Sequence, residues 1–149
     1  MVAGACRLGM STALTYKIRT DDFSEEERII RHGLNDYAKD TINIERGFMG
    51  VLAYDGDKMI GGLTSSVVGI TLGIKLLWVD KDFRGKSVGK NLLAKLEQHG
   101  KESGCTQSFV DTLTYQAPEF YIKQGYTEIA RITNYYDGYD RIFYRKELS

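Results

Sequence analysis

Residues 76–104 decide the fold, and they read LLWVDKDFRGKSVGKNLLAKLEQHGKESG. An apolar segment ends at Val79, a charged turn carries Arg84 to Gly89, and an amphipathic helical pattern starts inside that turn. Glycines and a serine between a strand and a helix leave successive backbone N–H groups unpaired, and the helix dipole adds positive charge where they converge. The stretch therefore predicts a binding site for a phosphate-bearing molecule.

The spacing of this turn excludes two common phosphate motifs. A Walker loop requires a glycine five residues before Gly85, and that position is Asp80. A dinucleotide fingerprint requires G-x-G-x-x-G, and the turn offers only Gly85 and Gly89. The turn does match the pattern Q/R-x-x-G-x-G/A, with Arg84 first, Gly89 last and Ser87 in place of the inner glycine.

A second motif follows, because residues 112–126 read TLTYQAPEFYIKQGY. This segment is similar to a strand end followed by A-x-x-F-Y-x-K-x-G-[FY]. In this order the two motifs resemble those of the GNAT superfamily of acyl-CoA-dependent N-acetyltransferases, and the match covers roughly residues 15 to 148. The resemblance implies an α/β (α+β) fold, a mixed and mostly antiparallel sheet of six or seven strands around a central βαβ unit that binds acyl-CoA.

Length and charge limit the other possibilities. The 149 residues are enough for one domain, expected at 14–149, while residues 1–13 are expected to be disordered, with Met10 as an alternative start. Lys plus Arg and Asp plus Glu are equal at 20 each, so no general attraction to nucleic acid or to an anionic membrane is expected.

Cysteines and histidines indicate neither a disulfide framework nor a metal site. Cys6 and Cys105 stand alone, and His32 and His99 have no metal-ligand spacing. We therefore expect a cytoplasmic, metal-free protein.

Periodicity predicts the elements of the chain. The apolar alternation of the central strand places Ile70, Leu72, Ile74 and Leu76 on one face, and the helix after the turn buries its leucines while Glu97 faces away. The expected elements are strands at 16–18, 48–54, 58–68, 70–79, 106–112, 126–133 and 141–148, and helices at 24–39 (capped by Ser24), from 88 to the stop at Gly104, and at 117–124.

The resemblance implies where acetyl-CoA binds. The turn would hold the pyrophosphate mostly through its backbone, and a central strand that diverges from its parallel neighbour would offer amides to the pantetheine arm and to the oxyanion of the reaction. Gln116, in the second motif, is a further candidate. The cofactor-binding residues are therefore Leu77, Trp78, Val79, Arg84, Gly85, Lys86, Ser87, Val88, Gly89, Lys90 and Gln116.

Attack of an amine on a thioester needs a base for the ammonium proton and an acid for the departing thiolate. Tyr121 occupies the position where GNAT-like enzymes carry a tyrosine near the thioester sulfur, so it is the candidate acid. Many members place a glutamate on the central strand, but here residues 71–79 hold only Lys75 among charged residues. Asp111 is the candidate base, and a water chain or an amine of lowered pKa is the alternative.

The resulting prediction is direct transfer of the acetyl group of acetyl-CoA to a primary amine. A non-catalytic acyl-CoA-binding or sensor module is the alternative. A small-molecule amine, an antibiotic, a polyamine and a protein N-terminus all stay open as acceptors, as does a homodimer. The resemblance puts Asp36, Tyr37 and Glu45 on the acceptor side, and the cluster Tyr135, Tyr136 and Tyr139 either there or in a dimer interface.

Overall fold

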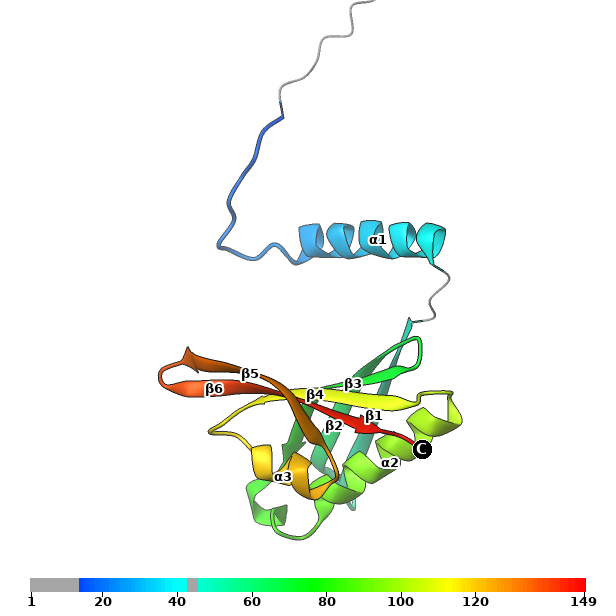
Figure 1. Cartoon of the computed structure of the whole chain (residues 1–149), viewed down its shortest axis with the longest axis vertical. Coiled ribbons are helices and arrows are strands. Elements are labelled where there is room, and N and C mark those ends of the chain that lie inside the picture. The colour runs from blue at the N-terminus through cyan, green and yellow to red at the C-terminus, as the bar shows by residue number, and fades with distance from the viewer. Residues whose placement is uncertain (1–13, 43–45) are drawn as a thin grey trace, which may run out of the picture. The chain divides into compact units, whose positions relative to one another are not determined.

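The computed structural model describes residues 14–42 and 46–149. Two expectations fall outside these residues, namely the disorder of residues 1–13 and the contact of Glu45 with the acceptor. The chain divides into an N-terminal unit up to Ile42 and a C-terminal unit that follows it. Each unit is described by itself (Figure 1).

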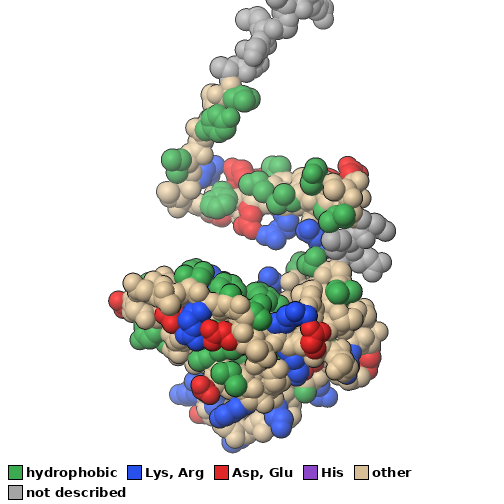
Figure 2. All heavy atoms as spheres, viewed as in Figure 1, with side chains coloured by type: hydrophobic (Ala, Val, Ile, Leu, Met, Phe, Trp, Pro, Cys, Tyr) green, Lys and Arg blue, Asp and Glu red, His purple; other side chains and the backbone are tan. Residues whose placement is uncertain are grey.

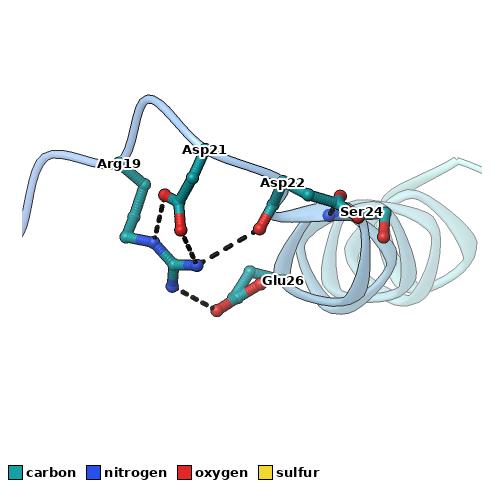
Figure 3. A network of polar contacts seen from close by, with 5 residues as sticks. All are labelled: Arg19, Asp21, Asp22, Ser24 and Glu26. Atoms are coloured by element: carbon teal, nitrogen blue, oxygen red, sulfur yellow. Dashed lines mark hydrogen bonds and ion pairs between the residues drawn. The ribbon is translucent and has the colours of Figure 1, made fainter.

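The N-terminal unit contains helix α1 (Ser24–Thr41), close to the predicted 24–39. The capping carboxylate is that of Asp22, whose Oδ1 accepts a hydrogen bond from the Ser24 N–H at 2.9 Å, so the prediction of Ser24 as the cap is wrong. The Arg19 guanidinium joins the preceding segment to the first turn, bonding Asp21 at 2.8 Å and Glu26 at 2.9 Å (Figure 3). These exposed ion pairs fix the start of the helix and add little to stability.

The strand predicted at residues 16–18 does not form. Tyr16 and Ile18 are 88% and 95% exposed, and within the described residues this segment belongs to no ladder. Alternation of two apolar residues leads to a strand only where a neighbouring strand pairs with the segment and its apolar side chains become buried.

The C-terminal unit is built on a six-stranded sheet of order β1-β2-β3-β4-β6-β5. Only β3 and β4 are parallel, and the other neighbours are antiparallel. This confirms the mixed, mostly antiparallel α/β fold. The strands are β1 (Arg46–Asp55), β2 (Lys58–Val68), β3 (Thr71–Val79), β4 (Gln107–Leu113), β5 (Thr127–Tyr136) and β6 (Tyr139–Glu147).

Helices α2 (Val88–Glu102) and α3 (Pro118–Lys123) lie on the same face of this sheet (Figure 1). The predicted core leucines Leu92, Leu93 and Leu96 of α2 are at most 3% exposed and pack with Leu63 and Leu72. Burial of this kind, at roughly 25 cal/mol per Å² of apolar surface, is what holds α2 on the sheet. We call the opposite sheet face the far face.

Strand β3 contains a bulge that changes which side chains face the core. Thr64 of β2 pairs with Leu76 and Ser65 pairs with Ile74, so Lys75 is an extra residue. The prediction that Leu76 shares a face with Ile74 is therefore wrong: Ile74 is 5% and Leu76 is 69% exposed. A bulge shifts the alternation by one residue, which places Leu77 and Val79 against the core instead.

Glu97 of α2 also departs from its prediction, because it is buried at 9% exposure. Its Oε1 accepts a hydrogen bond from the Tyr126 hydroxyl at 2.8 Å, and its Oε2 contacts Lys146 Nζ at 2.6 Å. The Tyr126 hydroxyl also lies 2.8 Å from Ser108 Oγ. A carboxylate at this depth is tolerated because it is paired and hydrogen-bonded.

Candidate active site

The turn between β3 and α2 has the backbone shape of an anion-binding loop. After a short 3-10 helix (Lys81–Phe83), Gly85 and Ser87 have φ of 72° and 63°, in the left-handed region. Such residues turn successive N–H groups toward one point, next to the N-terminus of α2. The Ser87 hydroxyl makes no capping hydrogen bond to α2, so Ser87 contributes to the turn through its backbone.

Two cationic side chains, Arg84 and Lys86, make contacts within the turn. Arg84 Nε donates to the Val79 carbonyl oxygen at 3.1 Å, which folds the turn back onto the end of β3. Lys86 Nζ lies 5.1 Å from the centroid of the Phe83 ring. Both side chains bring positive charge to the turn while the backbone N–H groups supply directed donors.

A cleft of about 770 Å³ runs from this turn along the end of β3 to α3. Lys and Arg side chains gather at this end of the C-terminal unit (Figure 2). Every residue predicted to bind acetyl-CoA lines the cleft except Lys86. The lining also includes Phe83, Ala117, Phe120, Lys123 and Gln124, which sequence reasoning did not assign. Lys123 is the lysine of the second motif, so the motif could have predicted that Lys123 lines the cleft.

Strands β3 and β4 separate beside the cleft. Their parallel ladder ends at the pair Gly73 and Phe109, although β3 continues to Val79 and β4 to Leu113. Beyond Gly73, β3 keeps its pairing with β2 on its other side. The backbone groups of Leu77 to Val79 on the β4 side therefore lie outside the sheet ladder, and an extended ligand is able to use them.

Gln116 closes the end of β4. Its Oε1 accepts hydrogen bonds from the Leu113 N–H at 3.0 Å and the Thr112 hydroxyl at 2.9 Å. The side chain thus fixes the turn into α3, which begins with Pro118 at a position suited to proline.

Tyr121 on α3 is 6% exposed and lies in an aromatic cluster. Its ring centroid is 5.1 Å from Phe120, 5.7 Å from Tyr126 and 6.3 Å from Tyr144. In the described part of the chain no buried side-chain nitrogen or oxygen lacks a hydrogen-bond partner. Burial, and after it the negative charge of Asp111, raises the pKa of Tyr121 to about 12.

Asp111 lies on the far face of β4, just past the point where β3 and β4 separate. Its Oδ2 is 2.8 Å from Arg141 Nε and 2.6 Å from Nη2. Neither Asp111 nor Tyr121 is part of the cleft lining, but the charge of one acts on the phenol of the other. The two candidate catalytic residues therefore lie on opposite faces of the sheet, and the electrostatic effect of Asp111 on the Tyr121 phenol is what connects them.

Replacing Ser87 by glycine is expected to stabilise the protein. A non-glycine residue in the left-handed region costs about 1–2 kcal/mol, and glycine avoids this cost. Part of the gain is lost because glycine gives up more conformational entropy on folding. The expected gain is about 0.5–1 kcal/mol in the free energy of unfolding measured in urea, with acetyl-CoA binding retained. Ser87→Ala is the matched control and should stay within about 0.5 kcal/mol of wild type, because the hydroxyl makes no cap. A less stable Ser87→Gly variant would contradict this account.

An anion-binding turn, a cleft and a separated parallel strand pair define the chain as a protein that binds a phosphate-bearing, extended cofactor. The model of the Acetyltransferase (GNAT) family matches residues 13–126. The chain therefore belongs to the GNAT acetyltransferase family, as its two motifs predicted. Members of this acetyltransferase family take the acetyl group from acetyl-CoA, so the chain is an acetyl-CoA-dependent acyltransferase.

Individual relatives agree with this assignment. Over 92 residues the chain is 39% identical to a blasticidin-S acetyltransferase of Streptomyces morookaense, covering 61% of this chain and 68% of that protein. A solved structure from Agrobacterium tumefaciens has a TM-score of 0.84 at 23% identity, covering 90% of this chain and 99% of that one. An aminoglycoside 6′-N-acetyltransferase solved with coenzyme A has a TM-score of 0.62 at 19% identity, covering 87% and 96%. At these identities the two structures show the fold alone.

Proposed function

We propose that the protein acetylates the primary amine of a small, amine-bearing molecule of the antibiotic type by direct attack on acetyl-CoA. The separation of β3 from β4 beside Tyr121 carries the proposal, because it leaves one opening where a thioester, a phenol and an acceptor amine can meet. The 39% identity to an enzyme named for blasticidin-S favours an amine-bearing antibiotic over a polyamine or a protein N-terminus.

The proposed cofactor contacts follow the cleft. The turn from Arg84 to Lys90 holds the pyrophosphate, with Lys86 adding charge from outside the lining, and the backbone of Leu77, Trp78 and Val79 receives the pantetheine arm. Gln116 supports the cleft wall between β4 and α3. The same β3 backbone offers an N–H to the oxyanion, a role that needs no side chain.

The proposed reaction has one addition and one elimination. The amine nitrogen forms a bond to the thioester carbonyl carbon, and its surplus proton passes to Asp111 or, through water, to solvent. The carbon–sulfur bond then breaks, and the thiolate leaves as CoA while Tyr121 donates to it. A phenol of pKa about 12 is a weak proton donor to a thiolate, so Tyr121 acts mainly as a hydrogen-bond donor as charge develops on sulfur.

A ligand series tests the proposal in two stages. Acetyl-CoA and CoA should raise the melting temperature by mass action, whereas ATP and NADPH should not. CoA thiol release is then measured with blasticidin-S, spermidine, an aminoglycoside and an alanyl peptide as acceptors. Equal shifts with ATP would reject the cofactor assignment, and a faster rate with spermidine or the peptide would reject the acceptor class.

We also propose a cytoplasmic location, where acetyl-CoA is available, and a homodimer. The exposed tyrosines of the β5–β6 hairpin, with Tyr136 at 65% exposure, offer the rigid aromatic area that interfaces favour. Separately, no helix in the described residues is long and apolar enough to cross a membrane, and no group of three His, Cys, Asp or Glu side chains there could hold a metal. Light scattering on the purified protein tests the dimer.

A further inference from the structure

The side chain of Arg141 connects three strands, β4, β5 and β6. Its Nε and Nη2 donate to Asp111 Oδ2 at 2.8 and 2.6 Å, and its Nη1 donates to the Tyr135 hydroxyl at 2.8 Å. The guanidinium also lies 5.0 Å from the ring centroid of Tyr135 and 5.6 Å from that of Phe143. A planar fork bonded at both ends and stacked on aromatic rings has little rotational freedom left.

The backbone beneath Arg141 is held as firmly. Arg141 stands directly opposite Leu113 in the β4–β6 ladder. Next to it, the Asp140 N–H donates to Thr114 Oγ1 at 3.0 Å, and the Thr114 N–H donates to the Asp140 carbonyl oxygen at 3.0 Å. The base of the β5–β6 hairpin is therefore fixed to the end of β4, and Arg141 is a rigid support for what it contacts.

Arg141 contacts the carboxylate of Asp111, which lies beside the opening between β3 and β4. Asp111 follows Phe109, the last residue of β4 that pairs with β3, by two positions on the same face. Both guanidinium contacts use Oδ2, and within the described residues Oδ1 accepts no hydrogen bond. One oxygen is thus used to fix the carboxylate, and the other stays available to an incoming amine.

We propose that Arg141 is a positioning residue for the acetyl transfer, which holds the Asp111 carboxylate at the opening between β3 and β4 with Oδ1 turned to the acceptor amine. This inference rests on the proposed function. A displacement of about 1 Å of a group that orients a reactant costs on the order of a hundredfold in rate. Loss of the guanidinium should therefore affect the acceptor and leave the donor site unchanged.

The test compares Arg141→Met with wild type, using blasticidin-S or the fastest acceptor of the panel. We expect kcat/KM for the amine to fall at least tenfold, while KM for acetyl-CoA and the CoA-induced rise in melting temperature stay unchanged. Arg141→Lys keeps the charge but cannot make the forked contact, so it should recover only part of the loss. Arg145→Met, four residues further along β6 and on the same face in the alternation, is the matched control and should retain wild-type kinetics.

Two outcomes would overturn the inference while leaving the proposed function intact. One is wild-type kcat/KM for the amine in Arg141→Met. The other is a loss in Arg141→Met that Asp111→Asn does not share, because Arg141 would then not act through Asp111. Should Arg141→Met fail to fold, Arg141→Lys decides alone: an acceptor-specific loss supports the inference and wild-type kinetics overturn it. No CoA release by wild-type protein with any amine would instead reject the proposed function.

Discussion

Replacing Tyr121 by phenylalanine is expected to lower kcat about ten- to a hundredfold while KM for acetyl-CoA stays near its wild-type value. A hydrogen bond to a charged group contributes about 1.5–3 kcal/mol, and each 1.36 kcal/mol is a factor of ten in rate. Because the sulfur becomes negative only as its bond to carbon breaks, the contribution appears in the transition state and not in cofactor binding.

The control for Tyr121→Phe is Tyr144→Phe. Tyr144 is a neighbouring ring, 6.3 Å away and 1% exposed, but burial is what mainly raises the pKa of its phenol, and Asp111 is not among the charges that act on it. It should therefore retain its kcat. An unchanged kcat in Tyr121→Phe, or an equal loss in both variants, would remove Tyr121 as the donor to the thiolate.

The pH dependence offers a second readout on Tyr121. Its pKa of about 12 lies above the ordinary value of 10, so the protonated, donating form persists up to about pH 12. Any decline of kcat below about pH 11 should then have another origin. Asp111→Asn removes one of the two causes of the shift, so it should move the loss of the phenol proton toward pH 10. The free energy of unfolding should also fall with rising pH. The stabilising contribution of the neutral phenol is fully present below pH 10 and is lost between pH 10 and 12, because the folded protein holds this proton more tightly than the unfolded chain.

The parts of the site that are local in sequence were predictable. The turn at 84–89 and the second motif at 112–126 carry their meaning in residue type and spacing, and both line the observed cleft. The separation of the two strands was implied by the resemblance and is present in the ladder. Leu76 was assigned wrongly because a bulge is a property of the paired backbone, which residue alternation does not reveal.

Long-range polar partners were out of reach for a different reason. Glu97 was placed outside because it is charged, although it follows Leu93 by one helical turn and so lies on the buried side of α2. Its partners Tyr126 and Lys146 are 29 and 49 residues away. Arg141 is likewise 30 residues from Asp111. Pairing across such separations is decided by tertiary structure, and no periodicity of the sequence encodes it.

Replacing Lys146 by methionine is expected to cost about 2–3 kcal/mol in the free energy of unfolding, measured in urea. Removing one partner of a buried ion pair leaves an uncompensated charge, which typically costs 3–5 kcal/mol. We expect a smaller cost because the side chains of Glu97 and Lys146 are still 12% and 25% exposed to solvent. In addition, the Tyr126 hydroxyl still donates a hydrogen bond to Glu97 in the variant. Arg145→Met, which breaks an exposed pair with Glu147 on the same strand, should cost less than about 1 kcal/mol.

The double variant Glu97→Leu, Lys146→Met separates the cost of an unpaired charge from the worth of the pair. Because apolar residues of similar volume often replace a buried pair without loss, the double variant should be more stable than Lys146→Met alone. Tyr126 and Ser108 would keep their hydroxyls bonded to each other. Glu97 lies ten residues beyond Ser87, about 15 Å along α2, so the CoA-induced rise in melting temperature should persist in both variants. A Lys146→Met variant as stable as wild type would mean that water reaches Glu97 and that the pair does not hold α2 to β6.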